Sequence, residues 1–430
     1  MNTRANRTRW ALLVAGGALL TAVTIGASAP AFAAPAAPVP AAGAANGISH
    51  TAVALLPPLD PAAIQKVLDQ HPTPDVTGAL VRVSGSAGSF QGASGTGDLA
   101  TGQAVDPNGR FRIGSISKVF TTAVVLQLAG ERRLDLDGTV QQYLPGVLPK
   151  KFPLVTVGEL LNHTSGLPTG SEEMWGDGST AWFEAHRLDS WTPEQVVATL
   201  KGQPTDSQPG TAQQVPTMNF DPGTAQQYNG MNTFLAGMVI ERVTGHSFAH
   251  EVRDRIIRPL GLHQTSVPDA DNPALPHPSS HAYLTVTDPD GTTHQADVTE
   301  QSPWPWAEGG LISSASDLDR FFSALFQGRL LPASVQENLF TVPDVPNFHN
   351  NDCGKGPSSR ACMSMGLERI EQGGLVAWGK TGSRPGYTSG VFATRDLSRK
   401  VVYSVNPTGL AGAETPYASR LLVTSFGLTR

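Results

Sequence analysis

The sequence is poor in cysteine and in charged residues. Only two of its 430 residues are cysteines, and Asp, Glu, Lys and Arg together make up 15% of the chain. No His-Glu-x-x-His or Cys-x-x-Cys sequence occurs and the eleven histidines are scattered, so we expect no metal site and no cofactor. The formal net charge of −6 leaves no basic excess with which to bind nucleic acid. We therefore expect neither a zinc protein nor a nucleic-acid-binding protein.

Long apolar runs are lacking beyond the N-terminus. Three arginines among the first nine residues precede an apolar stretch from Trp10 to Ile25, and Ala31-Phe32-Ala33 follows it. This order is typical of a signal peptide over residues 1–33, with a membrane anchor as the alternative. Because the apolar run is short and a cleavage signal follows, we expect a secreted protein without stable membrane insertion. Cleavage would remove three arginines and no acid, changing the formal charge from −6 to −9 (27 basic minus 36 acidic residues).

The order of the remaining segments indicates one α+β domain. Residues 34–58 are rich in Ala and Pro and are predicted to be disordered, and residues 59–430 form the domain. Strand-like segments occur near its start and again from Leu375 onward, while the middle is mostly helical. We therefore expect an antiparallel sheet flanked by helices, built from about 59–118 and 300–430. A mostly helical part, about 119–299, would be inserted into it, with the site between the two parts.

Ser115 and Lys118 are the strongest candidates for chemistry. They stand three residues apart where an apolar helix begins, so they share one face of that helix. A serine hydroxyl needs a base beside it, and a buried lysine can serve because burial disfavours the ammonium form. The alternative is a helix-capping serine beside a solvated lysine. This is the only Ser-x-x-Lys in a chain with eight lysines, and two further motifs lie downstream.

The downstream motifs are Tyr228 and Lys380-Thr381-Gly382. A tyrosine beside the Ser115–Lys118 pair could pass a proton to a leaving group, although a lone tyrosine is more often a packed side chain with one hydrogen bond. Lys380 could hold a substrate charge, and Gly382 would let a substrate approach the backbone. Taken alone, Lys-Thr-Gly is more often a coincidence at the end of a strand.

Together the three motifs resemble those of the β-lactamases and penicillin-binding proteins. The chain is similar to the secreted D-alanyl-D-alanine carboxypeptidases of the class C β-lactamase-like serine hydrolase family. The resemblance runs from about Asp75 to Phe426 and includes Arg110 to Lys118, Leu160 to Leu167, Gly309 to Phe322 and Gly379 to Gly386.

The resemblance implies a β-lactamase/DD-peptidase-like fold and an acyl-enzyme mechanism. Ser115 would be acylated, and Lys118 and Tyr228 would share the general acid and base work. The backbone amides of Ser115 and Ser383 would form the oxyanion hole.

The substrate would be held by a second set of residues. The resemblance implies that Lys380 and Thr381, with Gly382, bind the region of the substrate carboxylate. Arg369 and Arg384 are further candidates for gripping that carboxylate.

The middle motif departs from the family pattern. Tyr-x-Asn is usual, and this chain has Tyr228-Asn229-Gly230. The missing asparagine normally binds the substrate amide and orients the lysine. Asn229 or Asn232 could substitute for it, and the change could mark an altered substrate preference.

Cys353 and Cys362 bracket a short loop with glycine and proline. In an exported protein two nearby cysteines are expected to form a disulfide.

The sequence thus predicts a monomeric, exported D-alanyl-D-alanine carboxypeptidase that acts on peptidoglycan stem peptides and is acylated by β-lactams. The alternatives are a β-lactamase, an esterase or a D-amino-acid amidase on the same scaffold, and a penicillin-binding module without hydrolytic activity. Fold alone does not decide among them.

Overall fold

A computed structural model describes residues 56–71, 73–170, 174, 176–202, 216–348, 353 and 359–428. The predicted signal peptide and nearly all of the predicted disordered segment lie outside these residues. Within them, no helix combines the length and the apolar character needed to cross a bilayer.

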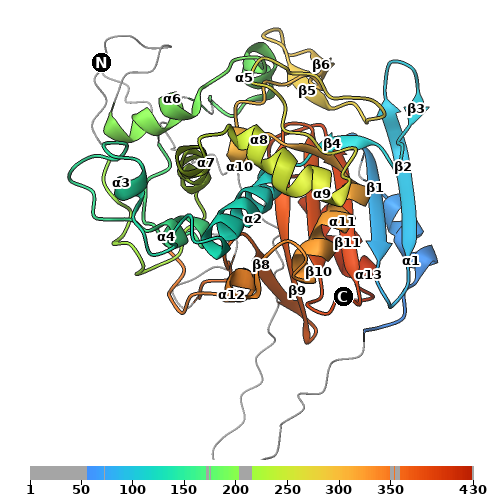
Figure 1. The fold of residues 1–430 in the computed structure, drawn as a ribbon. Helices are drawn as coiled ribbons and strands as arrows, with labels where there is room; N and C mark the ends of the chain where they lie inside the picture. The colour runs from blue at the N-terminus through green and yellow to red at the C-terminus, as the bar shows by residue number, and fades with distance from the viewer. Residues whose placement is uncertain are drawn as a thin grey trace, which may run out of the picture.

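The centre of the fold is an antiparallel sheet that joins the two ends of the domain. Within the described residues it has seven strands in the order β3-β2-β1-β11-β10-β9-β8. The strands are β1 (Val76–Ser84), β2 (Phe90–Asp98), β3 (Gln103–Ala104), β8 (Glu368–Gln372), β9 (Leu375–Arg384), β10 (Tyr387–Ala393) and β11 (Lys400–Pro407). Since β1 pairs with β11, the first and last strands meet in one sheet (Figure 1), which confirms the predicted α+β architecture.

Helices cover both faces of this sheet. On one face α1 (Pro61–Leu68) and α13 (Thr415–Ser425) lie together (Figure 1), packing apolar residues such as Ile64 and Leu421 against the sheet. The other face carries the larger core, which includes Val119, Phe120 and Phe321. Alternate residues of a strand point to opposite faces, so β11, which is buried along its whole length, contributes to both cores.

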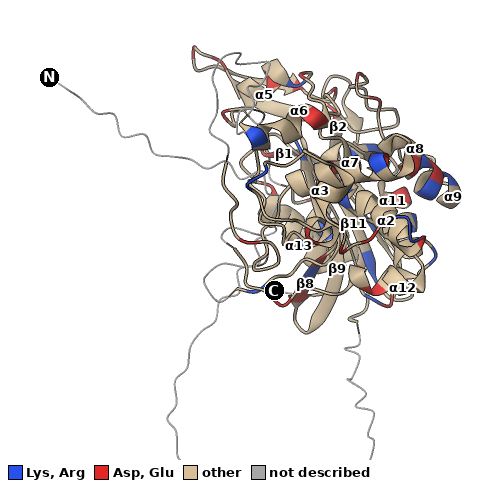
Figure 2. Ribbon diagram, turned by 60° about the vertical axis from the view of Figure 1, so that its left-hand side comes forward, with Lys and Arg blue, Asp and Glu red and all other residues tan. Residues whose placement is uncertain are grey.

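The larger core is built mainly from helices. The long ones are α2 (Ser117–Gly130), α7 (Met231–Thr244) and α11 (Ala315–Phe326). The shorter ones are α3 (Val140–Tyr143), α4 (Val157–Leu161), α5 (Thr180–His186), α6 (Pro193–Ala198), α8 (Phe248–Val252), α9 (Arg258–Leu260), α10 (Trp306–Gly309) and α12 (Ala333–Gln336). Figure 2 shows basic and acidic residues together along α8 and α9.

Two small sheets accompany the main sheet, and one strand boundary bears on the site. Two small sheets, β4 (Arg110–Arg112) with β7 (Ile312–Ser314) and β5 (Tyr283–Thr287) with β6 (Thr293–Asp297), supplement the main sheet. The strand expected from Leu375 onward continues to Arg384, and β10 pairs with it from Trp378 to Arg384. Lys380-Thr381-Gly382 therefore lies inside β9, where it pairs with β10, rather than after a strand.

Candidate active site

Ser115 lies in a tight turn that leads directly into α2. Gly114 to Ile116 form a single 3₁₀ turn, and Ser115 is partly exposed while its neighbours are buried. Gly114 has φ +48°, and a Cβ there would lie 2.4 Å from the carbonyl oxygen of Ser383. Glycine is therefore required at this position, because it lets the turn approach β9 closely.

Lys118 is one turn further along and reaches back to Ser115. Its Nζ lies 3.0 Å from Ser115 Oγ, within hydrogen-bond distance. The Lys118 side chain is 3% exposed, as expected from the apolar sequence of α2. The predicted nucleophile–base geometry is thus present.

Glu308 at α10 also holds Lys118. Lys118 Nζ donates to the backbone oxygen of Glu308 at 2.9 Å and forms an ion pair with its carboxylate. The sequence analysis missed this residue, because nothing in the segment Trp-Ala-Glu-Gly-Gly signals contact with a lysine 190 positions earlier.

Tyr228 lies close to both lysines of the motifs. Lys118 Nζ is 5.0 Å and Lys380 Nζ is 4.6 Å from the centroid of the Tyr228 ring. Two cations this close to the ring are attracted electrostatically by its π electrons. The structure therefore brings the residues of all three motifs together.

His163 packs against the ring of Tyr228. The sequence analysis did not single out this histidine. Its ring centroid lies 4.8 Å from that of Tyr228, and its Nδ1 accepts the backbone N–H of Asn229 at 3.3 Å. Burial, followed by the charges of Lys118 and Lys380, holds the pKa of His163 well below its ordinary value. His163 is therefore neutral and serves as a hydrogen-bond acceptor.

The strand β9 forms the opposite wall of the site. Lys380 and Thr381 are buried, and Lys380 Nζ donates to Thr381 Oγ1 at 3.3 Å. A Cβ on Gly382 would lie 2.0 Å from the backbone oxygen of Ile113, so Gly382 is required for close packing of this wall.

The two predicted oxyanion-hole residues also come together. A Cβ on Gly114, the residue before Ser115, would lie 2.6 Å from the backbone nitrogen of Ser383. The two segments that carry the Ser115 and Ser383 amides are thus in direct contact.

The side chains of both neighbouring asparagines are held by hydrogen bonds within the protein. Asn229 Nδ2 donates to Leu167 O at 2.7 Å, and its Oδ1 accepts the N–H of Met231 at 2.9 Å. Asn232 is fully buried, and its Oδ1 accepts from Ser165 Oγ at 2.6 Å. The Asn229 side chain thus tethers a loop and the start of α7, which corrects its expected role in substrate binding.

The two candidate arginines differ in their surroundings. Arg369 lies on the outer strand β8, where its guanidinium pairs with Glu371 at 2.7 Å, so the structure gives it a surface ion pair. Arg384 at the end of β9 donates to Gln301 Oε1 at 3.2 Å and to Ser302 O at 3.1 Å. Burial lowers the pKa of Arg384 to about 9, so it remains charged at neutral pH.

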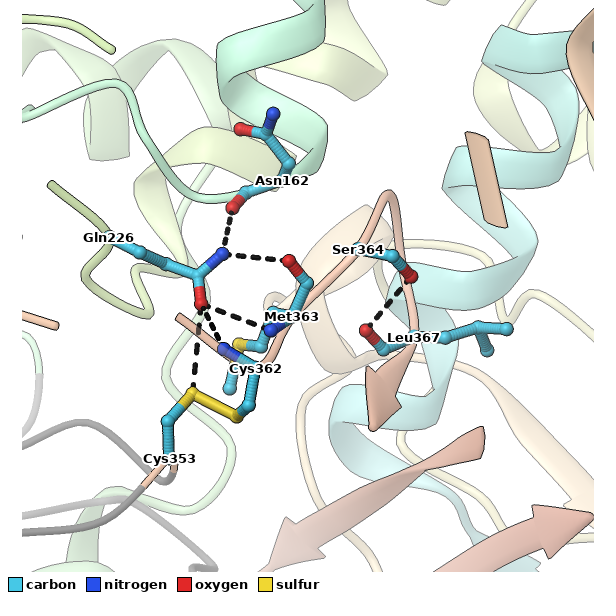
Figure 3. Close-up of a disulfide and its surroundings, with 7 residues drawn as sticks. All are labelled: Asn162, Gln226, Cys353, Cys362, Met363, Ser364 and Leu367. Carbon is cyan, nitrogen blue, oxygen red and sulfur yellow. Dashed lines mark hydrogen bonds between the residues drawn. A yellow bond between two sulfur atoms is a disulfide. The ribbon is translucent and has the colours of Figure 1, made fainter. Parts of the chain in front are cut away.

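The predicted disulfide is confirmed and lies beside the Tyr228 segment. Cys353 and Cys362 are bonded, with their Cα atoms 5.2 Å apart. Fully buried Gln226 links this region to Tyr228 two residues on (Figure 3): its Oε1 accepts the N–H groups of Cys362 and Met363, each at 3.0 Å. Its Nε2 donates to Asn162 O and Met363 O, each at 2.7 Å. One glutamine thus fixes three segments behind the site.

One group of side chains has the composition of a metal site. Ligand atoms of His246, His250 and Glu251 all lie within 4.8 Å of one another among the described residues. The Glu251 carboxylate is already paired with Arg255 at 2.5 Å and with His246 at 2.8 Å. This ion-pair network accounts for the cluster.

Comparison with known proteins agrees with this geometry. The family model described as Beta-lactamase matches residues 64–424. A D-stereospecific amidohydrolase from Streptomyces sp. is 32% identical in sequence, with a TM-score of 0.69 over 86% of this chain and 100% of that one.

Two penicillin-binding proteins are similar in sequence. Penicillin-binding protein 4 of Amycolatopsis lactamdurans is 30% identical over 57% of this chain, which spans 58% of that relative's length. Penicillin-binding protein 4* of Bacillus subtilis is 24% identical over 76% of this chain and 68% of the relative. The family match covers most of the domain and includes all three motifs, and the chain belongs to the Beta-lactamase family of serine hydrolases.

Proposed function

We propose that this protein is an exported D-alanyl-D-alanine carboxypeptidase that cleaves the terminal residue of peptidoglycan stem peptides. The observation that carries the proposal is the 3.0 Å contact between Ser115 Oγ and buried Lys118 Nζ, beside a wall that presents Lys380. The relatives named as penicillin-binding proteins support it.

The first half of the reaction forms an acyl-enzyme. Ser115 Oγ attacks the carbonyl carbon of the peptide bond while its proton passes to the Lys118–Tyr228 pair. The amides of Ser115 and Ser383 hold the oxyanion of the tetrahedral intermediate. The C–N bond then breaks, and the leaving D-alanine nitrogen takes up the proton. Water hydrolyses the resulting ester, which releases the shortened peptide and restores the Ser115 hydroxyl.

The charges of the site favour a substrate with a free carboxylate. Lys380 is 4% exposed, and within the described part of the chain its ammonium has no ion pair with a carboxylate. Arg384 donates to neutral oxygens of Gln301 and Ser302. A buried cation without a counter-ion is costly, so a bound carboxylate would stabilise this wall.

A second candidate is a D-amino-acid amidohydrolase. Its support is the similarity to the D-stereospecific amidohydrolase, together with glycine at position 230 instead of the usual asparagine. Such an enzyme would use the same acyl-enzyme chemistry on amides that lack a terminal carboxylate.

A paired assay on the purified domain separates these functions. We expect fluorescent penicillin to label Ser115 and D-alanine to be released from a peptide that ends in D-Ala-D-Ala. Labelling that disappears rapidly by hydrolysis would indicate a β-lactamase, and stable labelling without D-alanine release would indicate a binding module. Release of ammonia from D-amino-acid amides, with no release of D-alanine, would identify the amidohydrolase and refute the carboxypeptidase.

A further inference from the structure

Glu308 contacts the catalytic lysine through two different oxygens. The backbone oxygen lies 2.9 Å from Lys118 Nζ, and the carboxylate forms an ion pair with the same nitrogen. The Glu308 side chain is only 14% exposed and the Lys118 side chain 3%, so little water screens this pair.

These two contacts orient the amine of Lys118. A carbonyl oxygen and a carboxylate oxygen can only accept hydrogen bonds, so Lys118 Nζ directs N–H groups toward both. Nζ is tetrahedral, and Ser115 Oγ at 3.0 Å lies in a further direction. Glu308 therefore limits rotation of the amine and aims it at the nucleophile.

Gly230 provides the space that the Glu308 side chain occupies. A Cβ at position 230 would lie 3.1 Å from both Cγ and Oε1 of Glu308 and 3.3 Å from Cδ. These distances are shorter than ordinary van der Waals contacts, and any larger side chain would extend further into the carboxylate. The identity of residue 230 is thus linked to the ion pair of Lys118, although residue 230 does not touch Lys118 in any described contact.

We propose that Glu308 is a positioning residue for Lys118. Its carboxylate can occupy this place because residue 230 is a glycine and has no side chain. The Glu308 carboxylate takes the place that a side chain from position 230 would otherwise fill. The proposal rests on Ser115 and Lys118 being the acyl-transfer pair, and it holds for any acyl substrate.

The pair also influences when Lys118 can accept a proton. Lys118 is faced by the Glu308 carboxylate from α10, by Lys380 from β9, by Tyr228 ahead of α7 and by neutral His163 after α4. Arg384 from β9 adds a positive charge near Glu308. Glu308 is the one carboxylate among these groups and favours the ammonium form of Lys118. Its removal should therefore move the ascending limb of the pH–rate profile to lower pH.

The test measures acylation by p-nitrophenyl acetate, an ester that needs no peptide or carboxylate recognition. We expect Glu308→Gln to lower the acylation rate at pH 7.5 at least tenfold and to move the ascending limb by half a pH unit or more to lower pH. Gly230→Asn should lower the rate to a similar extent, because its side chain displaces Glu308. Adding Glu308→Ala to Gly230→Asn should raise the rate above that of Gly230→Asn alone.

Controls separate positioning from general damage. Glu337→Gln removes an ion pair with Arg395 on the surface and should leave rate and pH profile unchanged. Circular dichroism and thermal melting establish that each variant is folded. If Gly230→Asn does not fold, Gly230→Ala can replace it, because its Cβ alone makes a close contact with the Glu308 side chain.

Two results would overturn the proposal. One is a Glu308→Gln enzyme whose pH–rate profile keeps its ascending limb at the wild-type pH, whether or not its rate falls. Glu308 would then have only a structural role, which does not move the limb. The other is a double variant, Gly230→Asn with Glu308→Ala, that is no faster than Gly230→Asn alone. Failure of the D-alanine-release assay would not affect this test, because the ester reports on Ser115 and Lys118 independently of the peptide substrate.

Discussion

The imidazole of His163 packs against the phenol of Tyr228, with ring centroids 4.8 Å apart, and accepts hydrogen bonds at Nδ1. The donors are the backbone N–H of Asn229 at 3.3 Å and the side-chain amide of Asn232 at 3.2 Å. A neutral histidine thus packs against a tyrosine whose ring lies close to two lysines. A proton on Nδ1 would occupy the lone pair that accepts these hydrogen bonds, so both would be lost.

His163 should make stability depend on pH. The folded-state pKa of His163 is well below that of an unfolded histidine, about 6.5, because of burial and then the two lysines. The unfolded chain therefore binds a proton that the folded protein does not. Stability is fully present above pH 6.5 and falls as pH drops, by up to about 1.4 kcal/mol per unit.

The His163→Asn variant provides the measurement. Asparagine does not titrate, can accept through its amide oxygen, and tolerates the φ of +61° found at this position. Urea unfolding between pH 7.5 and 5 should show a flatter pH dependence than in the wild type. An equal slope in both proteins would show that His163 does not contribute.

Ser115→Ala should abolish covalent labelling by fluorescent penicillin. The substitution removes the only atom that can form the acyl bond, while the fold around α2 keeps its buried contacts. Gel fluorescence and intact-mass spectrometry provide the measurement, and Ser117→Ala, two residues further along the chain, is the control. Retained labelling of Ser115→Ala would place the nucleophile elsewhere.

Lys380→Ala should weaken binding of substrates that carry a terminal carboxylate. A charge-assisted hydrogen bond contributes about 1.5–3 kcal/mol, which corresponds to a rise in KM of roughly 10- to 100-fold. The comparison is between a D-Ala-D-Ala peptide and its C-terminal amide, with exposed Lys66→Ala as the control. Equal losses for acid and amide would mean that Lys380 does not bind the carboxylate.

Gln226→Leu should destabilise the protein markedly. Leucine would leave the buried groups of Asn162, Cys362 and Met363 without partners, at about 1–3 kcal/mol for each unsatisfied group. We expect a loss of about 3 kcal/mol or more in unfolding free energy, measured by urea denaturation. A loss below about 1 kcal/mol would show that the surrounding backbone finds other partners.

Replacing both cysteines by serine should lower stability more than activity. The bond closes a loop between residues nine positions apart, for which chain entropy predicts about 2–3 kcal/mol. Urea unfolding of the double variant, compared with oxidised wild type, measures the loss, and the acylation rate should stay within about threefold. Two free thiols in the native protein, detected by mass spectrometry, would contradict the predicted disulfide.

The sequence by itself determined the parts of the site that are local. Ser115 and Lys118 are three residues apart on one apolar segment, so helical spacing alone brings them together, and their 3.0 Å contact agrees with this. The alternation of apolar residues likewise predicted strands at both ends of the domain, and β1 and β11 pair as expected. The disulfide followed from two nearby cysteines in a chain expected to be exported.

Only the tertiary structure decided which distant residues complete the site. Glu308 and His163 reach Lys118 and Tyr228 from other segments, and no periodicity in the sequence encodes such a meeting. Asn229 was expected near the substrate, yet backbone groups of the 167–168 loop engage its amide. The role of Gly230 also depends on tertiary structure. Its lack of a side chain matters because Glu308, far away in the chain, fills that space. Side-chain contacts across a fold depend on packing in three dimensions, whereas helical and strand patterns depend on neighbours along the chain.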